Sequence, residues 1–130
     1  MLKDIMKRKD IVVQYKSRTV IGLTEKVLVK GKGKGKEVMA RVDTGATKSS
    51  MDMKLAAELS LGPVLRTKLV KSASGSSIRP VLKGKVEIAN KEIISEFTLA
   101  DRSHMKYKVL IGQDILVDNA FIIDPTKKGD

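Results

Sequence analysis

The chain of 130 residues contains no Cys and no Trp, and its aromatic side chains are limited to one His, two Phe and two Tyr. Without Cys no disulfide can stabilise the fold, and the redox compartment is left open. A zinc site rich in His or Cys ligands cannot be assembled within one subunit, because His104 is the only imidazole and no His-Glu-x-x-His segment is present. We therefore expect no metal ion and a core of aliphatic side chains, with His104 as a surface loop residue.

Long apolar stretches are absent as well. No segment approaches the roughly 20 apolar residues that a transmembrane helix needs, and the first ten residues lack the apolar stretch of a signal peptide. The run from Lys30 to Lys36 alternates Lys with Gly and has no Ser or Thr in place, so it does not match a phosphate-binding loop. These absences predict no membrane association, a cytoplasmic location and no nucleotide or other cofactor.

Basic residues are in excess, with 26 Lys and Arg against 15 Asp and Glu, and the net charge is +11. Residues 1–36 hold eleven basic against three acidic side chains, whereas residues 37–130 hold fifteen against twelve. For the Lys-Gly run 30–36 we favour a solvated hairpin tip whose lysines protect an exposed edge from aggregation. The alternative is attraction of an acidic partner, either a glutamate-rich peptide or a nucleic acid. Nucleic acid is the weaker choice, because no aromatic residues interleave with the lysines and no known binding signature is present.

Short runs of Val, Ile and Leu separated by Gly, Ser and Asn predict a mainly β fold with one or two short helices. The length fits a single domain, 1–130, in which the basic N-terminal segment 1–18 is partly flexible. The expected strands span residues 10–15, 19–30, 36–42, 64–71, 78–89, 92–100, 107–111 and 120–124.

Local signals define the connections between these strands. A helix is expected from Met51 to Leu59, capped by Ser49 or Ser50 and stopped at Gly62-Pro63. A hairpin turn is expected at Ala89-Asn90-Lys91.

Asp43-Thr44-Gly45-Ala46 follows an apolar-alternating strand and places one carboxylate in a tight turn. Gly45 allows the backbone to approach the carboxylate and present its N–H to it, the Thr44 hydroxyl can lock the turn, and Ala46 keeps the floor small. Two carboxylates about 3 Å apart cannot both ionise, so they supply an acid and a base for activating water. Since the chain carries one such motif, this chemistry requires two chains. Taken alone, the same four residues are better explained by an ordinary strand-to-turn transition.

The second half of the chain supplies two further features in matching order. Val109 to Leu116 is an apolar strand that ends in Gly112 and runs into a short helical segment. With Asp43-Thr44-Gly45, it resembles the signatures of retropepsin-like aspartic proteases, in which such a strand crosses beneath the Asp-Thr-Gly loop and braces it. Between them, Lys71 to Ser77 is a turn of small residues where that fold carries its flap over the substrate.

A closer resemblance is carried by the segment from Thr98 to Tyr107, followed by Leu110-Ile111-Gly112 and by Phe121 to Pro125. These segments are similar to a family of small retropepsin-like proteins of bacteria and archaea known as ATP-dependent zinc proteases, often discussed alongside glutamate ligases. The resemblance covers roughly residues 19 to 126. It implies a retropepsin-like (acid protease) closed β-barrel with one or two short helices.

The resemblance also implies roles for residues of this chain. The catalytic residues are Asp43, Thr44 and Gly45. The substrate-binding residues are Ala46, Ser74, Gly75 and Ser76, and the site is supported by Leu110, Ile111, Gly112, Asp101 and Arg102. We expect Asp101 and Arg102 to form an ion pair, Asp114 to cap the following helix or pair with a basic residue, and Asp124 to mark a strand exit.

The sequence departs from viral retropepsins at two positions, because Thr47 and Gln113 stand where those proteins usually carry an acidic residue and Arg. A charged bracing pair near the dimer interface is therefore absent, and other contacts must hold a dimer. The leading functional hypothesis is a homodimeric aspartic peptidase that hydrolyses peptide or isopeptide bonds, with an acidic or glutamate-rich peptide or protein as substrate. The alternatives are a catalytically inactive dimerisation or peptide-binding module and, last, a basic nucleic-acid-binding protein.

Overall fold

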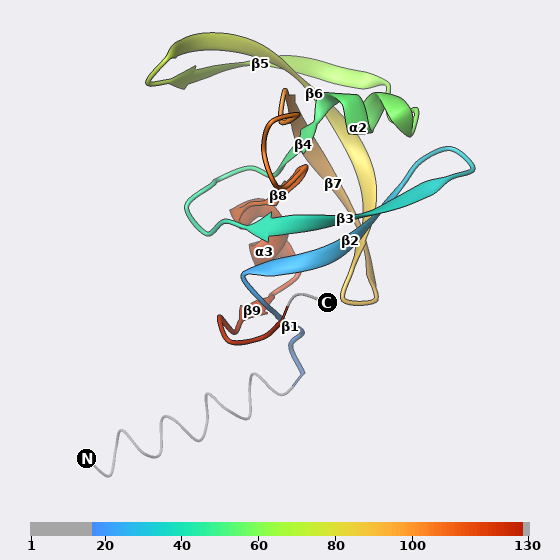
Figure 1. Ribbon diagram of the computed structural model, residues 1–130, viewed down its shortest axis with the longest axis vertical. Helices are drawn as coiled ribbons and strands as arrows, with labels where there is room; N and C mark the ends of the chain where they lie inside the picture. Colours follow the sequence, from blue (N-terminus) through green and yellow to red (C-terminus); the bar gives the residue numbers. More distant parts are fainter. Residues whose placement is uncertain (1–16, 129–130) are drawn as a thin grey trace.

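The computed structural model describes residues 17–128, and its described part is mainly β (Figure 1). The strand expected at 10–15 and residues 1–16 of the basic segment lie outside the described residues. The strands are β1 (Val20–Ile21), β2 (Thr24–Lys30), β3 (Gly35–Val42), β4 (Ser50–Asp52), β5 (Val64–Ser72), β6 (Gly75–Ile88), β7 (Lys91–Ala100), β8 (Val109–Ile111) and β9 (Ile122–Ile123). The helices are α2 (Met53–Glu58) and α3 (Gln113–Asp118).

Six strands close into a barrel. The order β2-β3-β8-β4-β7-β6 is completed by antiparallel pairing of β6 with β2, so no strand edge is open within this ring. Among the strands that the structure describes, β5 pairs only with β6, outside the ring, and β1 pairs with β9 in a separate parallel ribbon. The expected closed β-barrel with two short helices is thereby confirmed.

The long strand β6 belongs to two structures at once. Its second half pairs with β7 and β2 in the barrel, whereas its first half pairs with β5 and extends across the top of the molecule (Figure 1). We call the extending part, residues 67–80, the flap hairpin. Its turn falls at Ala73 and Ser74, since Ser72 pairs with Gly75, and it matches the turn expected between Lys71 and Ser77.

The interior of the barrel is aliphatic around one aromatic ring. Phe97 is fully buried, and it lies against Gly84 on the neighbouring strand, where a Cβ would approach the ring to 3.1 Å. Glycine at this position therefore makes room for the ring. The core also contains Phe121 and is otherwise formed by Val, Ile, Leu, Ala and Met side chains.

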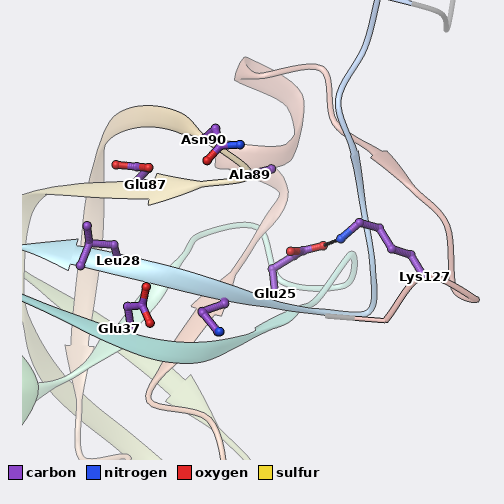
Figure 2. A pocket seen from close by; sticks show the side chains of 8 residues that line it. Glu25, Leu28, Glu37, Glu87, Ala89, Asn90 and Lys127 are labelled. Atoms are coloured by element: carbon purple, nitrogen blue, oxygen red, sulfur yellow. Dashed lines mark hydrogen bonds and ion pairs between the residues drawn. The ribbon is translucent and has the colours of Figure 1, made fainter. Parts of the chain in front are cut away.

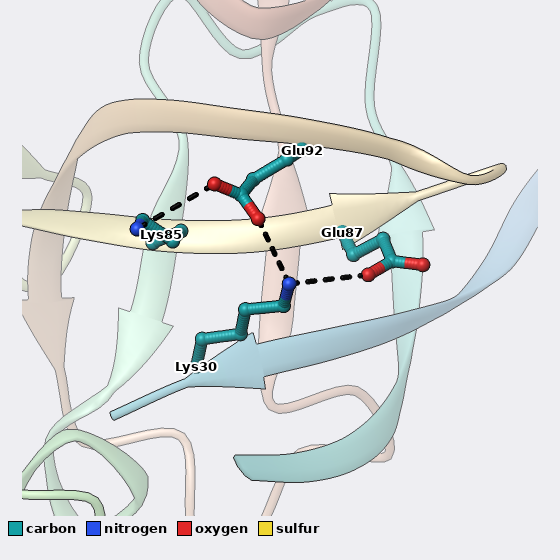
Figure 3. A network of polar contacts seen from close by, with 4 residues as sticks. All are labelled: Lys30, Lys85, Glu87 and Glu92. Atoms are coloured by element: carbon teal, nitrogen blue, oxygen red, sulfur yellow. Dashed lines mark hydrogen bonds and ion pairs between the residues drawn. The ribbon is translucent and has the colours of Figure 1, made fainter. Parts of the chain in front are cut away.

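Two hairpins match their expected positions. Ala89 and Asn90 both have positive φ and join β6 to β7 in a two-residue turn. The Lys-Gly run forms the β2–β3 hairpin tip, where Lys30 pairs with Gly35. Lys30 is half-buried there and contacts two acids, with its Nζ 3.3 Å from Glu87 and 2.9 Å from Glu92 (Figure 3). The tip is exposed from residue 32 to residue 36, which confirms the solvated hairpin.

The helix expected from Met51 to Leu59 is shorter than predicted. Residues 50–52 form β4, which lies between β7 and β8, and α2 begins only at Met53. Asp52, and neither of the expected serines, caps the helix by accepting a hydrogen bond from the backbone N–H of Leu55 at 3.3 Å. Among the described residues, no helix has the length and hydrophobicity that a bilayer-spanning helix requires.

Candidate active site

The Asp43 turn and the Gly112 turn lie side by side because β3 and β8 are parallel neighbours. Val42 pairs with Ile111, so the residues that follow them leave the sheet at the same edge. The backbone N–H of Asp43 donates to the carbonyl of Ile111 at 2.8 Å. The expected bracing of the Asp-Thr-Gly loop by this strand is thus a direct backbone contact.

Inside the turn, Asp43 has the geometry expected from the motif. The backbone N–H of Gly45 donates to Oδ1 of Asp43 at 2.9 Å, and the N–H of Ala46 donates to the Asp43 carbonyl at 3.2 Å. Oδ2 of Asp43 has no hydrogen-bond partner within residues 17–128, and the side chain is partly exposed. One oxygen is therefore fixed by the turn and the other is open to a ligand.

Gln113 closes the turn from the adjoining helix. Its side-chain amide donates to the Thr44 carbonyl at 2.7 Å, and its backbone N–H donates to the Ala46 carbonyl at 2.7 Å. The Thr44 hydroxyl, which was expected to lock the turn, makes no hydrogen bond to the described part of the chain. A neutral amide thus supports the loop within the subunit, at the position where viral retropepsins usually carry Arg.

Ser49 links the Asp43 loop to the Gly112 turn through its side chain, a role that the sequence did not reveal. Its buried hydroxyl donates to Oδ1 of Asp114 at 2.7 Å and accepts the backbone N–H of Gly112 at 2.9 Å. Asp114 also accepts the Ser49 and Ile115 backbone N–H groups, so it ties α3 to the 43–49 loop. It pairs with no basic side chain of residues 17–128, and Gly112 is the helix N-cap.

Gly112 is required by close packing. A Cβ on this residue would lie 2.7 Å from the Lys48 carbonyl carbon and oxygen and 2.9 Å from the Ala46 carbonyl oxygen. All three contacts are with backbone atoms, which cannot rotate away as a side chain could. Only glycine therefore allows the two turns to lie this close.

The ion pair expected between Asp101 and Arg102 is not formed. Asp101 accepts the backbone N–H and hydroxyl of Ser103 at 3.0 and 2.6 Å, and these hydrogen bonds lower the pKa of its carboxyl group. Arg102 instead donates its backbone N–H to Asp52 at 2.8 Å and its Nε to the Tyr107 carbonyl at 3.0 Å. The two adjacent side chains are thus hydrogen-bonded to different partners.

A cleft of about 380 Å³ lies between the Asp-Thr-Gly loop and the flap hairpin. Its volume falls in the range of ligand-binding pockets. Of the residues expected to contact substrate, Ala46 lines it and residues 74–76 do not. The lining residues are Gly45, Ala46, Thr47, Lys48, Ser50, Lys68, Val70, Arg79, Thr98, Arg102 and Leu110.

A second pocket, of about 280 Å³, lies between β2, β3 and the β6–β7 turn, and none of its lining residues lines the first cleft (Figure 2). Its most buried charge, Glu25, accepts the Nζ of Lys127 at 2.6 Å and the backbone N–H of Gly22 at 2.8 Å. The pair attaches the chain after β9 to the barrel, so we assign it a structural role.

No cluster of three or more His, Asp or Glu side chains within residues 17–128 is arranged to hold a metal ion. The carboxylates of Asp52 and Asp114 accept backbone hydrogen bonds, and His104 lies exposed on a loop as expected. The possible metal ligands in the described part of the chain therefore do not fit the zinc ion that the name of the ATP-dependent zinc proteases implies.

The fold is similar to several solved structures of low sequence identity. The protease of EIAV in complex with the inhibitor HBY-793 has a TM-score of 0.62 and 19% identity, covering 78% of this chain and 90% of that one. A Legionella pneumophila protein of unknown function (DUF785) has a TM-score of 0.59 and 18% identity, covering 86% and 97%. The simian foamy virus protease has a TM-score of 0.55 and 16% identity, covering 72% and 91%. The retropepsin-like fold is confirmed by these similarities.

Sequence comparison addresses the family directly. No curated protein matches the chain. Residues 54–129, more than half of the chain, match the RimB-like family, described as retropepsin-like aspartic endopeptidase RimB. The matched segment begins after the Asp43 turn and contains the flap hairpin and the Gly112 turn. The chain therefore belongs to the RimB-like family of retropepsin-like aspartic endopeptidases.

Proposed function

We propose that this protein is an aspartic endopeptidase that acts as a homodimer, with Asp43 of each subunit contributing to one active site. The observation that carries the proposal is the Asp43 turn, in which Oδ1 is held by the Gly45 N–H while Oδ2 has no hydrogen-bond partner among residues 17–128. The sequence has a single Asp-Thr-Gly, so a dyad requires a second copy. Family membership supports the reaction class.

The chemistry follows from two carboxylates that share one proton. The ionised Asp43 takes a proton from a water molecule while the water oxygen bonds to the carbonyl carbon of the substrate bond that will be cleaved. The protonated Asp43 of the partner subunit gives its proton to the oxygen of that carbonyl group. As the tetrahedral product collapses, one of its hydroxyl groups returns a proton to the ionised carboxylate of the partner subunit, the now protonated Asp43 gives its proton to the leaving nitrogen, and the C–N bond breaks. The dyad returns to one shared proton, so no other reactant is consumed.

The residues around the Asp43 turn hold the loop, and with it the carboxylate, in a fixed position. Gln113, Ser49 and Gly112 fix the loop through hydrogen bonds of 2.7 to 2.9 Å and through backbone packing. A carboxylate held in this way needs little reorganisation when its partner approaches.

The substrate that fits the cleft best is an extended acidic peptide. The cleft lies between the flap hairpin and the loop, and four of its lining side chains are cationic. A glutamate-rich peptide or protein, cleaved at a peptide or isopeptide bond, is complementary to this charge.

The test compares the unmodified protein with Asp43→Asn and with Asp118→Asn as the matched control, since Asp118 is exposed at the end of α3. Glutamate-rich and unbiased peptides are assayed for cleavage, and the mass in solution is measured by sedimentation equilibrium. We expect a dimer in all three cases and loss of cleavage only in Asp43→Asn. Cleavage that survives Asp43→Asn, or a monomer at every concentration with and without peptide, would contradict the proposal. Peptide binding without any cleavage would favour the non-catalytic binding module.

A further inference from the structure

The loop between β7 and β8, residues 101–108, folds around the side chain of Lys108. The Nζ atom donates to three backbone carbonyls, those of Arg102 at 3.0 Å, Ser103 at 2.7 Å and Met105 at 3.2 Å. An ammonium group has three N–H donors and no acceptor, so these carbonyls occupy all of its donors. Within residues 17–128 no acidic side chain forms an ion pair with Lys108. The positive charge is therefore held by the backbone of its own loop.

The same loop forms part of the cleft wall through Arg102. The Nε of Arg102 donates to the Tyr107 carbonyl at 3.0 Å, and its backbone N–H donates to Oδ1 of Asp52 at 2.8 Å. Burial is the main cause of a lowered Arg102 pKa, and the carboxylates of Asp52 and Asp43 oppose this effect. Arg102 therefore lies within electrostatic reach of the candidate catalytic carboxylate.

Lys108 and Arg102 belong to one closed set of contacts. The Arg102 carbonyl accepts both the Lys108 ammonium and the backbone N–H of Met105, at 3.0 and 2.9 Å. The Lys108 carbonyl accepts the backbone N–H of Asp52 at 2.8 Å, and the side chain of Asp52 accepts that of Arg102. Both ends of the loop are thus fixed to Asp52, and the ammonium fixes the backbone between them. Lys108 itself does not line the cleft.

We infer that Lys108 is a positioning residue of the proposed peptidase, because its ammonium organises the loop carbonyls and thereby holds Arg102 on the cleft wall near Asp43. Three carbonyl oxygens directed at one point carry partial negative charge, and a positive charge between them offsets their mutual repulsion. Without the ammonium, carbonyls of the loop turn outward to water, and Arg102 moves with them. The inference rests on the proposed function in one respect, namely that the cleft is where the substrate binds.

A methionine at this position separates the ammonium from the rest of the side chain. Lys108→Met keeps an unbranched, flexible side chain and removes the charge and the three donors. If Lys108 acts only by packing its stem, this change is nearly neutral. Lys106→Met is the matched control, because Lys106 is exposed in the same loop and donates no hydrogen bond to the described part of the chain, its Nζ lying 5.5 Å from the centre of the Tyr107 ring.

Hydrogen exchange followed by NMR tests the loop without any substrate. The backbone N–H groups of Arg102 and Met105 are both hydrogen-bonded within this set of contacts. We expect them to exchange at least about tenfold faster in Lys108→Met and within about twofold of the unmodified protein in Lys106→Met. The Nε–H signal of Arg102, assigned by its loss in Arg102→Lys, should also exchange faster in Lys108→Met, since its bond to the Tyr107 carbonyl depends on the shape of the loop.

Cleavage of a glutamate-rich peptide tests the consequence for the site. Lys108→Met should lower kcat/KM by about tenfold, whereas Lys106→Met should stay within about twofold. Because Lys108 acts through Arg102, the same change made in the Arg102→Gln protein should alter kcat/KM by less than about twofold. A lysine with a merely structural role would cause the full loss in both backgrounds.

Unchanged exchange of the two backbone N–H groups in Lys108→Met overturns the role of the ammonium. Faster backbone exchange with an unchanged Arg102 Nε–H signal, or an equal loss of kcat/KM in both backgrounds, overturns the positioning of Arg102. Circular dichroism and thermal melts establish that each variant is folded, and Lys108→Gln tests the same expectations if Lys108→Met does not fold. Absence of cleavage by the unmodified protein would refute the peptidase, and the exchange of the Arg102 Nε–H would still decide whether Lys108 positions Arg102.

Discussion

Replacing Ser49 with Ala tests whether the two turns of the candidate site are held together as the structure indicates. The Ser49 hydroxyl is fully buried and joins the backbone N–H of Gly112 to the carboxylate of Asp114, at 2.9 and 2.7 Å. Alanine removes both hydrogen bonds and leaves the buried Gly112 N–H without a partner, at a cost of about 1–3 kcal/mol. Asp114 retains two backbone donors, so its loss is the smaller one. We therefore expect the free energy of unfolding to fall by about 2–4 kcal/mol.

This loss is large enough for two independent assays. Proteins of this length have an unfolding entropy of roughly 270 cal/mol/K, so each kcal/mol lowers Tm by about 4 °C, and Ser49→Ala should lower it by about 8–15 °C. Urea unfolding followed by circular dichroism gives the free energy directly. Ser95→Ala is the matched control, because the hydroxyl of Ser95 reaches only the Glu96 carbonyl at 3.4 Å, and we expect a change within about 0.5 kcal/mol. A loss below about 0.5 kcal/mol for Ser49→Ala would refute the role that we assign to its hydroxyl.

Two further substitutions test neighbouring parts of the structure. Gly112→Ala would place a Cβ 2.7 Å from the backbone of Lys48, so the turns must separate; we expect a loss of at least about 2 kcal/mol in urea unfolding, and wild-type stability would show that the close approach is wrong. Glu25→Leu removes the buried partner of Lys127 and leaves a buried backbone N–H unpaired, so we expect a loss of about 1–3 kcal/mol and faster proteolysis near the C-terminus. Glu37→Leu, on an exposed position of the adjacent strand, is the control, and an equal effect of the two changes would contradict the role of the buried pair.

The sequence predicted those features that depend on local patterns. Alternating apolar residues located β2, β3, β6 and β7, and the segment Ala89-Asn90-Lys91 located the β6–β7 hairpin, whose two turn residues have positive φ in the structure. The Asp43 turn was predicted down to the Gly45 N–H because its hydrogen bond joins residues only two positions apart. These features need no knowledge of distant contacts.

The features that the sequence did not reveal depend on contacts between distant residues. β4 has only three residues, too few for a periodic pattern, and it is a strand only because β7 and β8 flank it. Ser49 was assigned to a helix cap because Ser, Thr and Asp are interchangeable in that pattern, and its true partner is 65 residues away. Arg102 was paired with its neighbour in sequence, whereas the structure links its backbone to Asp52, 50 residues earlier.

The cleft between the Asp-Thr-Gly loop and the flap hairpin, which several cationic side chains line, also could not be predicted from local sequence patterns. The alternation along β5 and β6 predicts two faces for the flap hairpin, but it does not show which face lies over the Asp-Thr-Gly loop. The structure places Lys68, Val70 and Arg79 on that face. The small residues 74–76, which the sequence favours as substrate contacts, form the exposed end of the flap hairpin, and their contact with substrate stays a prediction.

The central claim is that two chains supply one Asp43 each to a single active site, and subunit mixing tests it most directly. Wild-type and Asp43→Asn proteins are mixed at constant total concentration, allowed to exchange subunits, and assayed for cleavage of a glutamate-rich peptide. If both carboxylates are needed, activity follows the square of the wild-type fraction, so an equal mixture retains about a quarter of the wild-type activity. Activity in direct proportion to the wild-type fraction, with about half remaining in the equal mixture, would show that each Asp43 acts alone, and about three quarters remaining would show that one Asp43 per dimer suffices; either result would contradict the shared dyad.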